Sequence, residues 1–293
     1  MAKSSVHIGR LVDESLQLAW RYRGLWLLGI FAGYGMNFNI EIPGGTTPDL
    51  LADIPIPSAW TIIYLVAMFF LAYSIAIPAL IWAIWGLVRT GTFNVRECLM
   101  VGVDVFPPVV LFNLVAMILF GVYAGFLGAM FGVLFALSTV AGVISLVIII
   151  PLGVIGMYGY VAMLNLTIRE LTIRRTGLIS AMGVSWQLIK RHPKPTFWVF
   201  LVAIGVLLAA LVALRFCFYV VSIPVALLAG DGAGMPAVYN LLLGLPFTLV
   251  VGGFFGTCAE TIYTMLYIKL EQPSRDDIWA TTGVKRSRSG PGE

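Results

Sequence analysis

Glu260 is the side chain of this sequence with the clearest potential for chemistry. It lies in a long apolar run, nine residues before Lys269. At the helical rise of about 1.5 Å per residue, it would stand about 13 Å inside the cytoplasmic boundary of a membrane. An ionisable group at that depth is costly unless it is paired or neutral. With no second acidic or basic residue expected at the same depth, the sequence predicts a Glu260 that faces the protein interior and is neutral at pH 7.

Two interpretations of Glu260 stay open. It is either a structural acid that hydrogen-bonds to a neighbouring helix and tolerates replacement by Gln, or a proton- or cation-coupled site. Arg215 is the obvious partner, but at about 1.5 Å per residue it lies about 27 Å along its run from Phe197, near the outer surface. The sequence favours an Arg215 that reaches external lipid head groups, with substrate binding as the alternative.

Glycines recur at helical spacing in three of the apolar runs. Small residues three or four positions apart share one helix face and allow another helix to approach closely. One such set precedes Glu260 on its own face. The pattern predicts tight helix packing, with a glycine-lined permeation path as the alternative for the second set. The glycines concerned are Gly29 and Gly33; Gly121, Gly125, Gly128 and Gly132; and Gly252 and Gly256.

The sequence contains no motif typical of a catalytic or metal site. The two histidines, His7 and His192, lie in separate polar segments, and Cys98, Cys217 and Cys258 have no paired spacing. There is no His-Glu-x-x-His helix, no phosphate-binding glycine loop and no Gly-x-Ser-x-Gly turn. We expect neither enzyme activity nor a cofactor or metal ion.

The composition is that of a polytopic membrane protein. Hydrophobic residues make up 60% of the chain and charged residues 11%, against about 25% charged residues in a soluble domain. The mean hydropathy is +0.96 and the isoelectric point is near 9.0. Cationic loops are retained in the cytoplasm and account for a basic isoelectric point, so no nucleic-acid partner is expected.

The basic residues define an orientation. All of the 18 Lys and Arg residues except Arg215 fall in four segments that alternate with apolar runs. This places both termini in the cytoplasm and requires an even number of spans, and the apolar runs predict six. Only Ser138 and Thr139 separate the third span from the fourth, so a tight external turn is expected there. The candidate spans are residues 25–40, 59–88, 109–137, 140–166, 197–228 and 238–270.

The chain reads as three copies of one unit, followed by a tail. Each unit begins with an amphipathic segment expected to lie flat on the inner face of the membrane, followed by a helix breaker and two spans. The units are residues 5–90, 91–175 and 176–271, and residues 272–293 are predicted to be a disordered basic cytoplasmic tail. The amphipathic segments are residues 7–22, 95–105 and 180–191, and the breakers are Gly24, Pro107 and Pro193.

Residues 16–29, LQLAWRYRGLWLLG, carry a resemblance to a large and poorly characterised bacterial family of six-span proteins. That family is similar to the membrane domain attached to some glycerophosphodiester phosphodiesterases. The resemblance implies a membrane domain alone, because the catalytic barrel with its His-Arg-Gly motif and metal-binding acids is absent here. It carries over no functional residues.

These features predict an all-α, polytopic protein built from three interfacial-helix-plus-hairpin units. The expected function is that of a non-enzymatic membrane module. It would pack against lipids, another membrane protein or a second copy of itself, and support assembly, lipid or envelope homeostasis. The alternative is a small-solute or lipid transporter that uses the Glu260 face. A polar cavity at Glu260 would favour transport, whereas glycine faces filled by neighbouring helices would favour the module.

Overall fold

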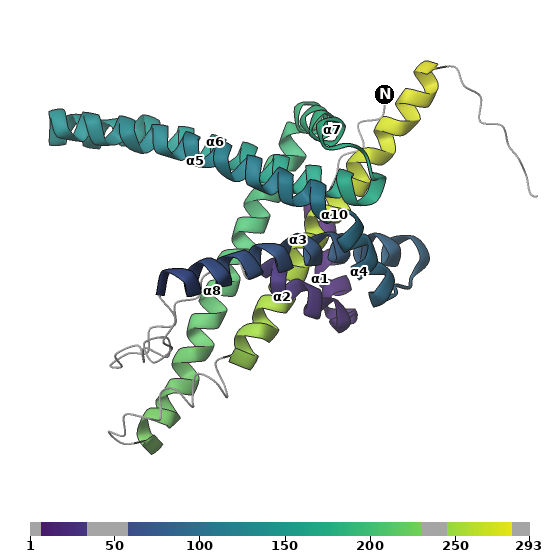
Figure 1. Ribbon diagram of the computed structural model, residues 1–293, viewed down its shortest axis with the longest axis horizontal. Helices are drawn as coiled ribbons and strands as arrows, with labels where there is room; N and C mark the ends of the chain where they lie inside the picture. The colour runs from purple at the N-terminus through teal and green to yellow at the C-terminus, as the bar shows by residue number, and fades with distance from the viewer. Residues whose placement is uncertain (1–6, 34–57, 230–244, 283–293) are drawn as a thin grey trace, which may run out of the picture.

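The computed structural model describes residues 7–33, 58–229 and 245–282, and every regular element in these ranges is helical. Short helices are interspersed among long ones along the chain (Figure 1). The elements are α1 (Ile8–Arg21), the 3₁₀ turn η1 (Arg23–Leu25), α2 (Trp26–Gly33), α3 (Ser58–Thr90), α4 (Val95–Asp104), α5 (Phe106–Leu137), α6 (Thr139–Arg174), α7 (Leu178–Arg191), α8 (Pro193–Ala229) and α10 (Leu245–Thr282).

Four helices are long and apolar enough to cross a membrane within the described ranges. They are Leu71–Thr90 in α3, Phe106–Leu137, which is α5, Thr139–Arg174, which is α6, and Pro193–Ala213 in α8. The protein is therefore all-helical and of membrane type. The remainder of the first predicted span, residues 34–40, and the start of the sixth, residues 238–244, lie outside the described residues.

A break in the backbone follows each of the short helices α1, α4 and α7 and separates it from the next helix. Tyr22 ends α1 with φ −109° and ψ 68°, and the indole Nε1 of Trp26 then donates to Ala19 O at 2.9 Å, which fixes the turn around Gly24. A proline occupies the first turn of α5, where its missing N–H removes no helical hydrogen bond. The third break is at His192, directly before Pro193. The predicted breakers therefore do separate helices.

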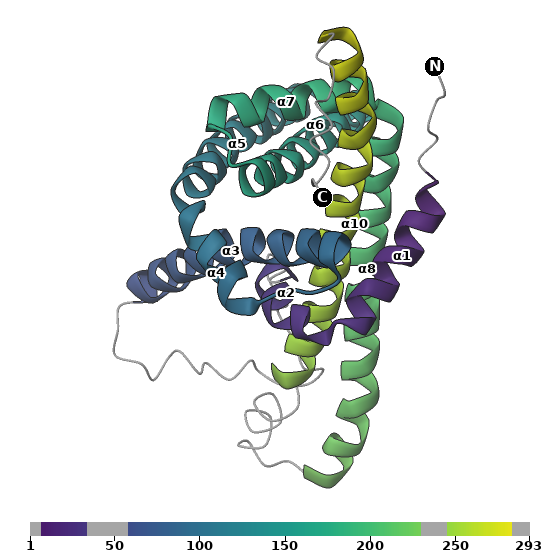
Figure 2. The same cartoon turned by 90° about the vertical axis from the view of Figure 1, so that its right-hand side faces the viewer.

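α5 and α6 form a hairpin that extends away from the other helices (Figures 1 and 2). Its turn is Ser138, which is extended with φ −166° and ψ 134°. Aromatic rings of α5 lie against glycines of α6: a Cβ on Gly142 would come within 2.6 Å of Phe135, and Tyr123 Oη donates to Leu152 O at 2.6 Å. Glycine is needed at such positions because any side chain would push the two helices apart.

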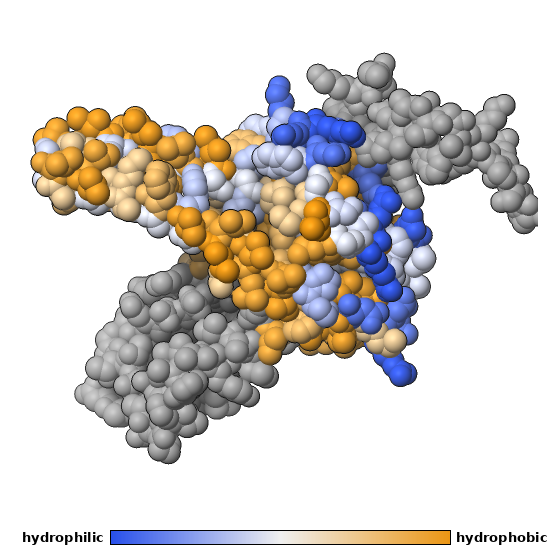
Figure 3. All heavy atoms as spheres, turned by 45° about the horizontal axis from the view of Figure 1, so that its top comes forward, coloured by the Kyte–Doolittle hydropathy of each residue, from blue (hydrophilic) through white to orange (hydrophobic). Residues whose placement is uncertain are grey.

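Apolar side chains cover most of the α5–α6 hairpin, whereas hydrophilic residues gather at the opposite end of the molecule (Figure 3). Only 22% of the most apolar stretch of α5 and 11% of that of α6 are buried inside the chain. The hairpin thus presents apolar surface that other parts of the described chain do not cover.

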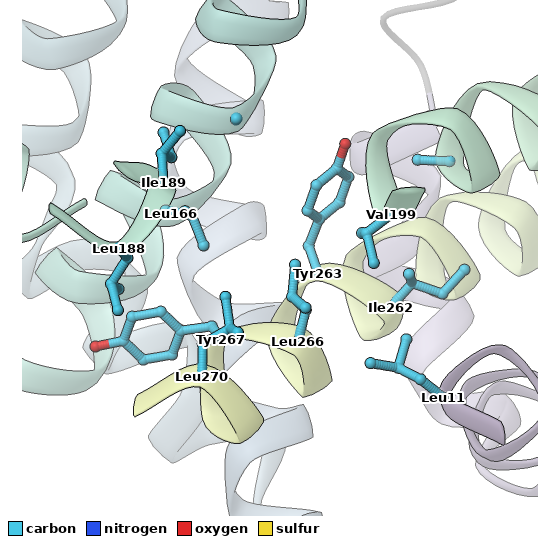
Figure 4. Packing of buried hydrophobic residues seen from close by; sticks show 12 residues of the cluster. Leu11, Leu166, Leu188, Ile189, Val199, Ile262, Tyr263, Leu266, Tyr267 and Leu270 are labelled. Atoms are coloured by element: carbon cyan, nitrogen blue, oxygen red, sulfur yellow. The ribbon is translucent and has the colours of Figure 1, made fainter. Parts of the chain in front are cut away.

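One of three apolar clusters among the described residues is built around α10. Ile262, Leu266 and Tyr267 of α10 are 1% exposed or less. They pack with Leu11 of α1 and Leu166 of α6, and the same cluster takes in residues of α7 and α8 (Figure 4). This cluster joins the ends of helices from all three predicted units.

α6 and α10 extend well beyond their predicted C-terminal limits. α6 continues past the predicted end of the fourth span at residue 166 to Arg174, because no glycine or proline interrupts it. α10 continues to Thr282, so the tail predicted to be disordered from residue 272 begins as helix. Residues 283–293 lie outside the described part of the chain.

Candidate functional site

Glu260 forms a buried ion pair with Arg169 between α10 and α6. Arg169 Nη2 donates to Glu260 Oε2 at 2.6 Å and to the carbonyl oxygen of the same residue at 3.1 Å. Arg169 is fully buried, and Glu260 is 9% exposed. A charge-assisted bond of this length, shielded from water, is among the strong polar interactions in proteins.

The remaining donors of the Arg169 guanidinium are also satisfied. Its Nε donates to Thr264 Oγ1 at 3.2 Å, and its Nη1 donates to Asn165 O at 2.6 Å and to Asn165 Oδ1 at 3.0 Å. The ring of Tyr263 lies with its centroid 5.2 Å from the guanidinium carbon, which is a cation–π contact. Each guanidinium nitrogen therefore has a partner on α6 or α10.

This pairing corrects the sequence interpretation of Glu260. The carboxylate does face the interior, but the expectation that no basic residue lies at its depth is wrong, and a salt bridge takes the place of the predicted neutral acid. The reason is the length of α6: Arg169 was assigned to a cytoplasmic segment, but it continues the helix beyond residue 166. Asn165 and Arg169, one helical turn apart beside Glu170 in an otherwise apolar run, were the available signal.

Further polar pairs continue this contact toward the C-terminal ends of both helices. The Tyr267 hydroxyl donates to the Glu170 carboxylate, and Arg174 pairs with Glu271. Together with the Arg169–Glu260 pair they form what we call the α6–α10 polar interface, which consists of Asn165, Arg169, Glu170, Arg174, Glu260, Thr264, Tyr267 and Glu271. Side chains of opposite charge on the two helices fix which faces meet and how far one helix is shifted along the other.

A more exposed ion pair ties α1 to the same end of α10. Lys269 Nζ donates to Glu14 Oε2 at 2.9 Å, and both side chains are 33% exposed. The hydrogen bond from Lys269 holds the pKa of the Glu14 carboxyl below its ordinary value of 4.5, with Arg10 adding to the effect and partial burial opposing it. α1 is thus attached to α10 by charge as well as by the buried Leu11.

Two glycines provide the close approach of α2 to α10. A Cβ on Gly29 would lie 2.9 Å from the backbone nitrogen of Thr257, and one on Gly253 would lie 2.7 Å from Trp26 O. Gly252 meets nothing within 4 Å, so Gly253 makes the contact that the sequence assigned to its neighbour. Gly256 is buried, and the surroundings of Gly33 lie outside the described residues.

The glycine stripe on α5 does not pack against another helix of the described chain. A Cβ on any of its four members would meet nothing within 4 Å, because the rings of Tyr123 and Phe135 carry the contact with α6 instead. The tight helix packing predicted for this stripe is therefore not seen among the described helices and stays a prediction. Its members are Gly121, Gly125, Gly128 and Gly132. Arg215 lies within α8, but its side chain is outside the described residues.

No group of three or more His, Cys, Asp or Glu side chains is placed to hold a metal ion in residues 7–33, 58–229 and 245–282. Cys98 is 1% exposed on α4, where burial and the nearby Glu97 raise the pKa of its thiol to about 11. A thiol with such a pKa is protonated at neutral pH and is a weak nucleophile.

Compared with protein-family models, with curated proteins and with solved structures, the chain has no match. The resemblance seen at residues 16–29 therefore stays a hypothesis. The function has to be argued from the geometry of the α6–α10 polar interface and from the exposed apolar surface of the α5–α6 hairpin.

Proposed function

We propose that the chain is a non-enzymatic integral membrane module of a bacterial inner membrane. It packs against lipids and against a partner protein or a second copy, and supports assembly, lipid or envelope homeostasis. The observation that carries this proposal is the α5–α6 hairpin, whose most apolar stretches are only 22% and 11% buried. Apolar surface that covers most of two long helices is unfavourable in water and is expected to be covered by lipid hydrocarbon chains or by another membrane protein.

The Arg169–Glu260 pair supports a structural role over transport. A transport site needs polar groups that can exchange their partners for a solute. Here the guanidinium is bonded through every nitrogen to protein atoms, and Arg169 has no exposed surface. An arrangement that uses all donors inside the protein acts as a clamp between α6 and α10.

Six spans, three repeated units and cytoplasmic termini belong to the same proposal, with α1, α4 and α7 lying on the inner face. Cation–aromatic pairs support this placement. The guanidinium of Arg23 lies 5.3 Å from the ring centroid of Trp20, and Lys190 Nζ lies 4.9 Å from that of Trp186. Tryptophan is enriched at the level of the lipid head groups, where basic side chains also collect.

One observation favours the alternative, a small-solute or lipid transporter that uses the Glu260 face. The hydroxyl of Tyr263 is buried beside the ion pair and has no hydrogen-bond partner among the described residues. A solute that bonded to this hydroxyl would stand next to Arg169 and Glu260. The transporter then requires that water reach this position during its cycle.

Labelling of position 264 separates the two functions. Thr264 has no exposed surface and accepts from Arg169, so Thr264→Cys in a variant without the three native cysteines reports access to the pair. The module predicts no reaction with a water-soluble maleimide in intact membranes, while Gln187→Cys on exposed α7 is labelled. Labelling at 264 as fast as at 187 would reject the module and favour the transporter.

A further inference from the structure

A groove of about 320 Å³ runs along the α5–α6 hairpin where α7 crosses its base. Its volume lies within the range of about 300–1,000 Å³ that is usual for ligand sites. Phe112 and Tyr123 mark its two ends on α5, and Leu164 and Gly156 mark them on α6. At about 1.5 Å per residue, the groove extends about 12 Å along α6, parallel to the hairpin axis.

The residues that line the groove carry no charge, and a basic side chain, Lys190, lies beside it at the α7 end. The carbon-rich side chains of Leu119, Phe120 and Met163 line its middle. Trp186 of α7 lines the groove near the base of the hairpin and is 48% exposed. The ammonium of Lys190 lies over that indole ring at 4.9 Å from its centroid, and α7 itself carries no acidic residue.

We propose that this groove binds one acyl chain of an anionic glycerophospholipid of the inner leaflet, with the lipid phosphate held at Lys190 and Trp186. The inference rests on the proposed membrane location and names the lipid contact of that module. The groove suits an acyl chain because it is apolar and runs along the hairpin, which in the proposed module crosses the bilayer in the direction of the lipid chains.

The charge beside Trp186 selects the head group. An apolar groove alone gives little preference among lipids, because hydrocarbon is already the solvent around the hairpin. A basic residue close to an anionic head group adds electrostatic attraction, and an indole at the interface provides a flat surface and an N–H donor. The preference for an anionic lipid over a zwitterionic one is therefore expected to come from Lys190.

Gly159 allows the groove to be filled without disturbing the fold. It lines the groove, and a Cβ there would meet nothing within 4 Å, so Gly159→Phe projects a ring into the space for the acyl chain. Gly153 lies on the same helix, also has open space at its Cβ and does not line the groove, so Gly153→Phe is the matched control. Lys190→Gln removes the charge and leaves the groove open.

The test is native mass spectrometry of the purified full chain in detergent micelles with added phosphatidylglycerol or phosphatidylcholine. The wild type is expected to retain one phosphatidylglycerol with a preference over phosphatidylcholine of about fivefold, the effect of one basic side chain near anionic head groups. Gly159→Phe should lose both lipids and Gly153→Phe neither. In Lys190→Gln, the ratio of bound phosphatidylglycerol to bound phosphatidylcholine should fall close to one.

Equal lipid binding by Gly159→Phe and Gly153→Phe would overturn the groove assignment, and an unchanged preference in Lys190→Gln would overturn the head-group assignment. Gly159→Leu, with a smaller side chain, provides the same test if the Phe variant does not fold. Failure of the wild type to incorporate into bilayers would reject the membrane module itself, whereas incorporation without a retained lipid would reject only this inference.

Discussion

Removing the carboxylate of Glu260 is expected to destabilise the fold strongly. In Glu260→Gln, the guanidinium of Arg169 keeps its place between α6 and α10 but loses the bond of 2.6 Å to a negative charge. Arginine cannot give up its proton, so the variant would contain a buried, uncompensated cation. The sequence alone led to the opposite expectation, that a structural Glu260 would tolerate Gln.

The size of the effect follows from burial. Side-chain exposure is 1% for Arg169 and 12% for Glu260, so water screens the pair little. Breaking a buried pair by removing one partner costs about 3–5 kcal/mol. In Arg169→Met the remaining acid can bind a proton and become neutral, so that variant should be less destabilised. The double variant should cost less than the sum of the single changes by about 1–3 kcal/mol.

The assay is the free energy of unfolding in mixed micelles, titrated with a denaturing detergent, for the wild type and the three variants. The Glu14–Lys269 pair is the matched control, because its bond of 2.9 Å joins side chains that are one third exposed. Glu14→Gln should cost less than about 1 kcal/mol. Additive effects of the Arg169 and Glu260 changes, or a Glu260→Gln cost no larger than that of Glu14→Gln, would refute the clamp.

Three further outcomes are expected. Gly29→Ala should destabilise the protein by about 1–3 kcal/mol because its Cβ would collide with α10, whereas Gly128→Ala, in open space on α5, should be neutral or stabilise by up to about 1 kcal/mol in the same titration. Because the pKa of Glu14 is lowered in the folded state, the contribution of Glu14 to the free energy of unfolding is present above pH 4.5 and is lost as the pH falls through the folded pKa. The difference in stability between the wild type and Glu14→Gln should therefore shrink on acidification. A difference that stays constant with pH would contradict the pairing. Cys98, with a pKa raised to about 11, should resist iodoacetamide at pH 8 until the protein is unfolded, as measured by mass spectrometry, and rapid alkylation in the folded state would disprove its burial.

Helix limits were largely predictable because their signals are local. The prolines at the start of α5 and α8 lack the N–H of a helix interior and lie in first turns, where that N–H is not needed; Pro78 and Pro151, by contrast, lie inside α3 and α6. Ser138 was recognisable as a turn only because the surrounding run is too long for one span. The end of α6 was missed because no breaker follows residue 166, and a charged residue in a continuing helix looks the same in sequence as one in a loop.

The candidate site was only half predictable. Burial of Glu260 followed from its place in an apolar run, but its partner lies 91 positions away in sequence, and pairing over that distance depends on how α6 and α10 are placed side by side. The glycines show the same limit. Four-residue spacing identifies a face but not its neighbour, so Gly253, and not Gly252, contacts α2, while the stripe on α5 faces away from α6.

The most direct test of the membrane module is the environment of the α5–α6 hairpin in a bilayer. Val122 on α5 and Val147 on α6 are 68% and 74% exposed, and a nitroxide at either position reports which solvent surrounds it. We predict that molecular oxygen, which concentrates in hydrocarbon, relaxes both labels more strongly than a water-soluble nickel chelate. A label at Gln187 on α7 should show the reverse order. Stronger relaxation by the nickel chelate at 122 and 147 would place the hairpin in water and contradict the account.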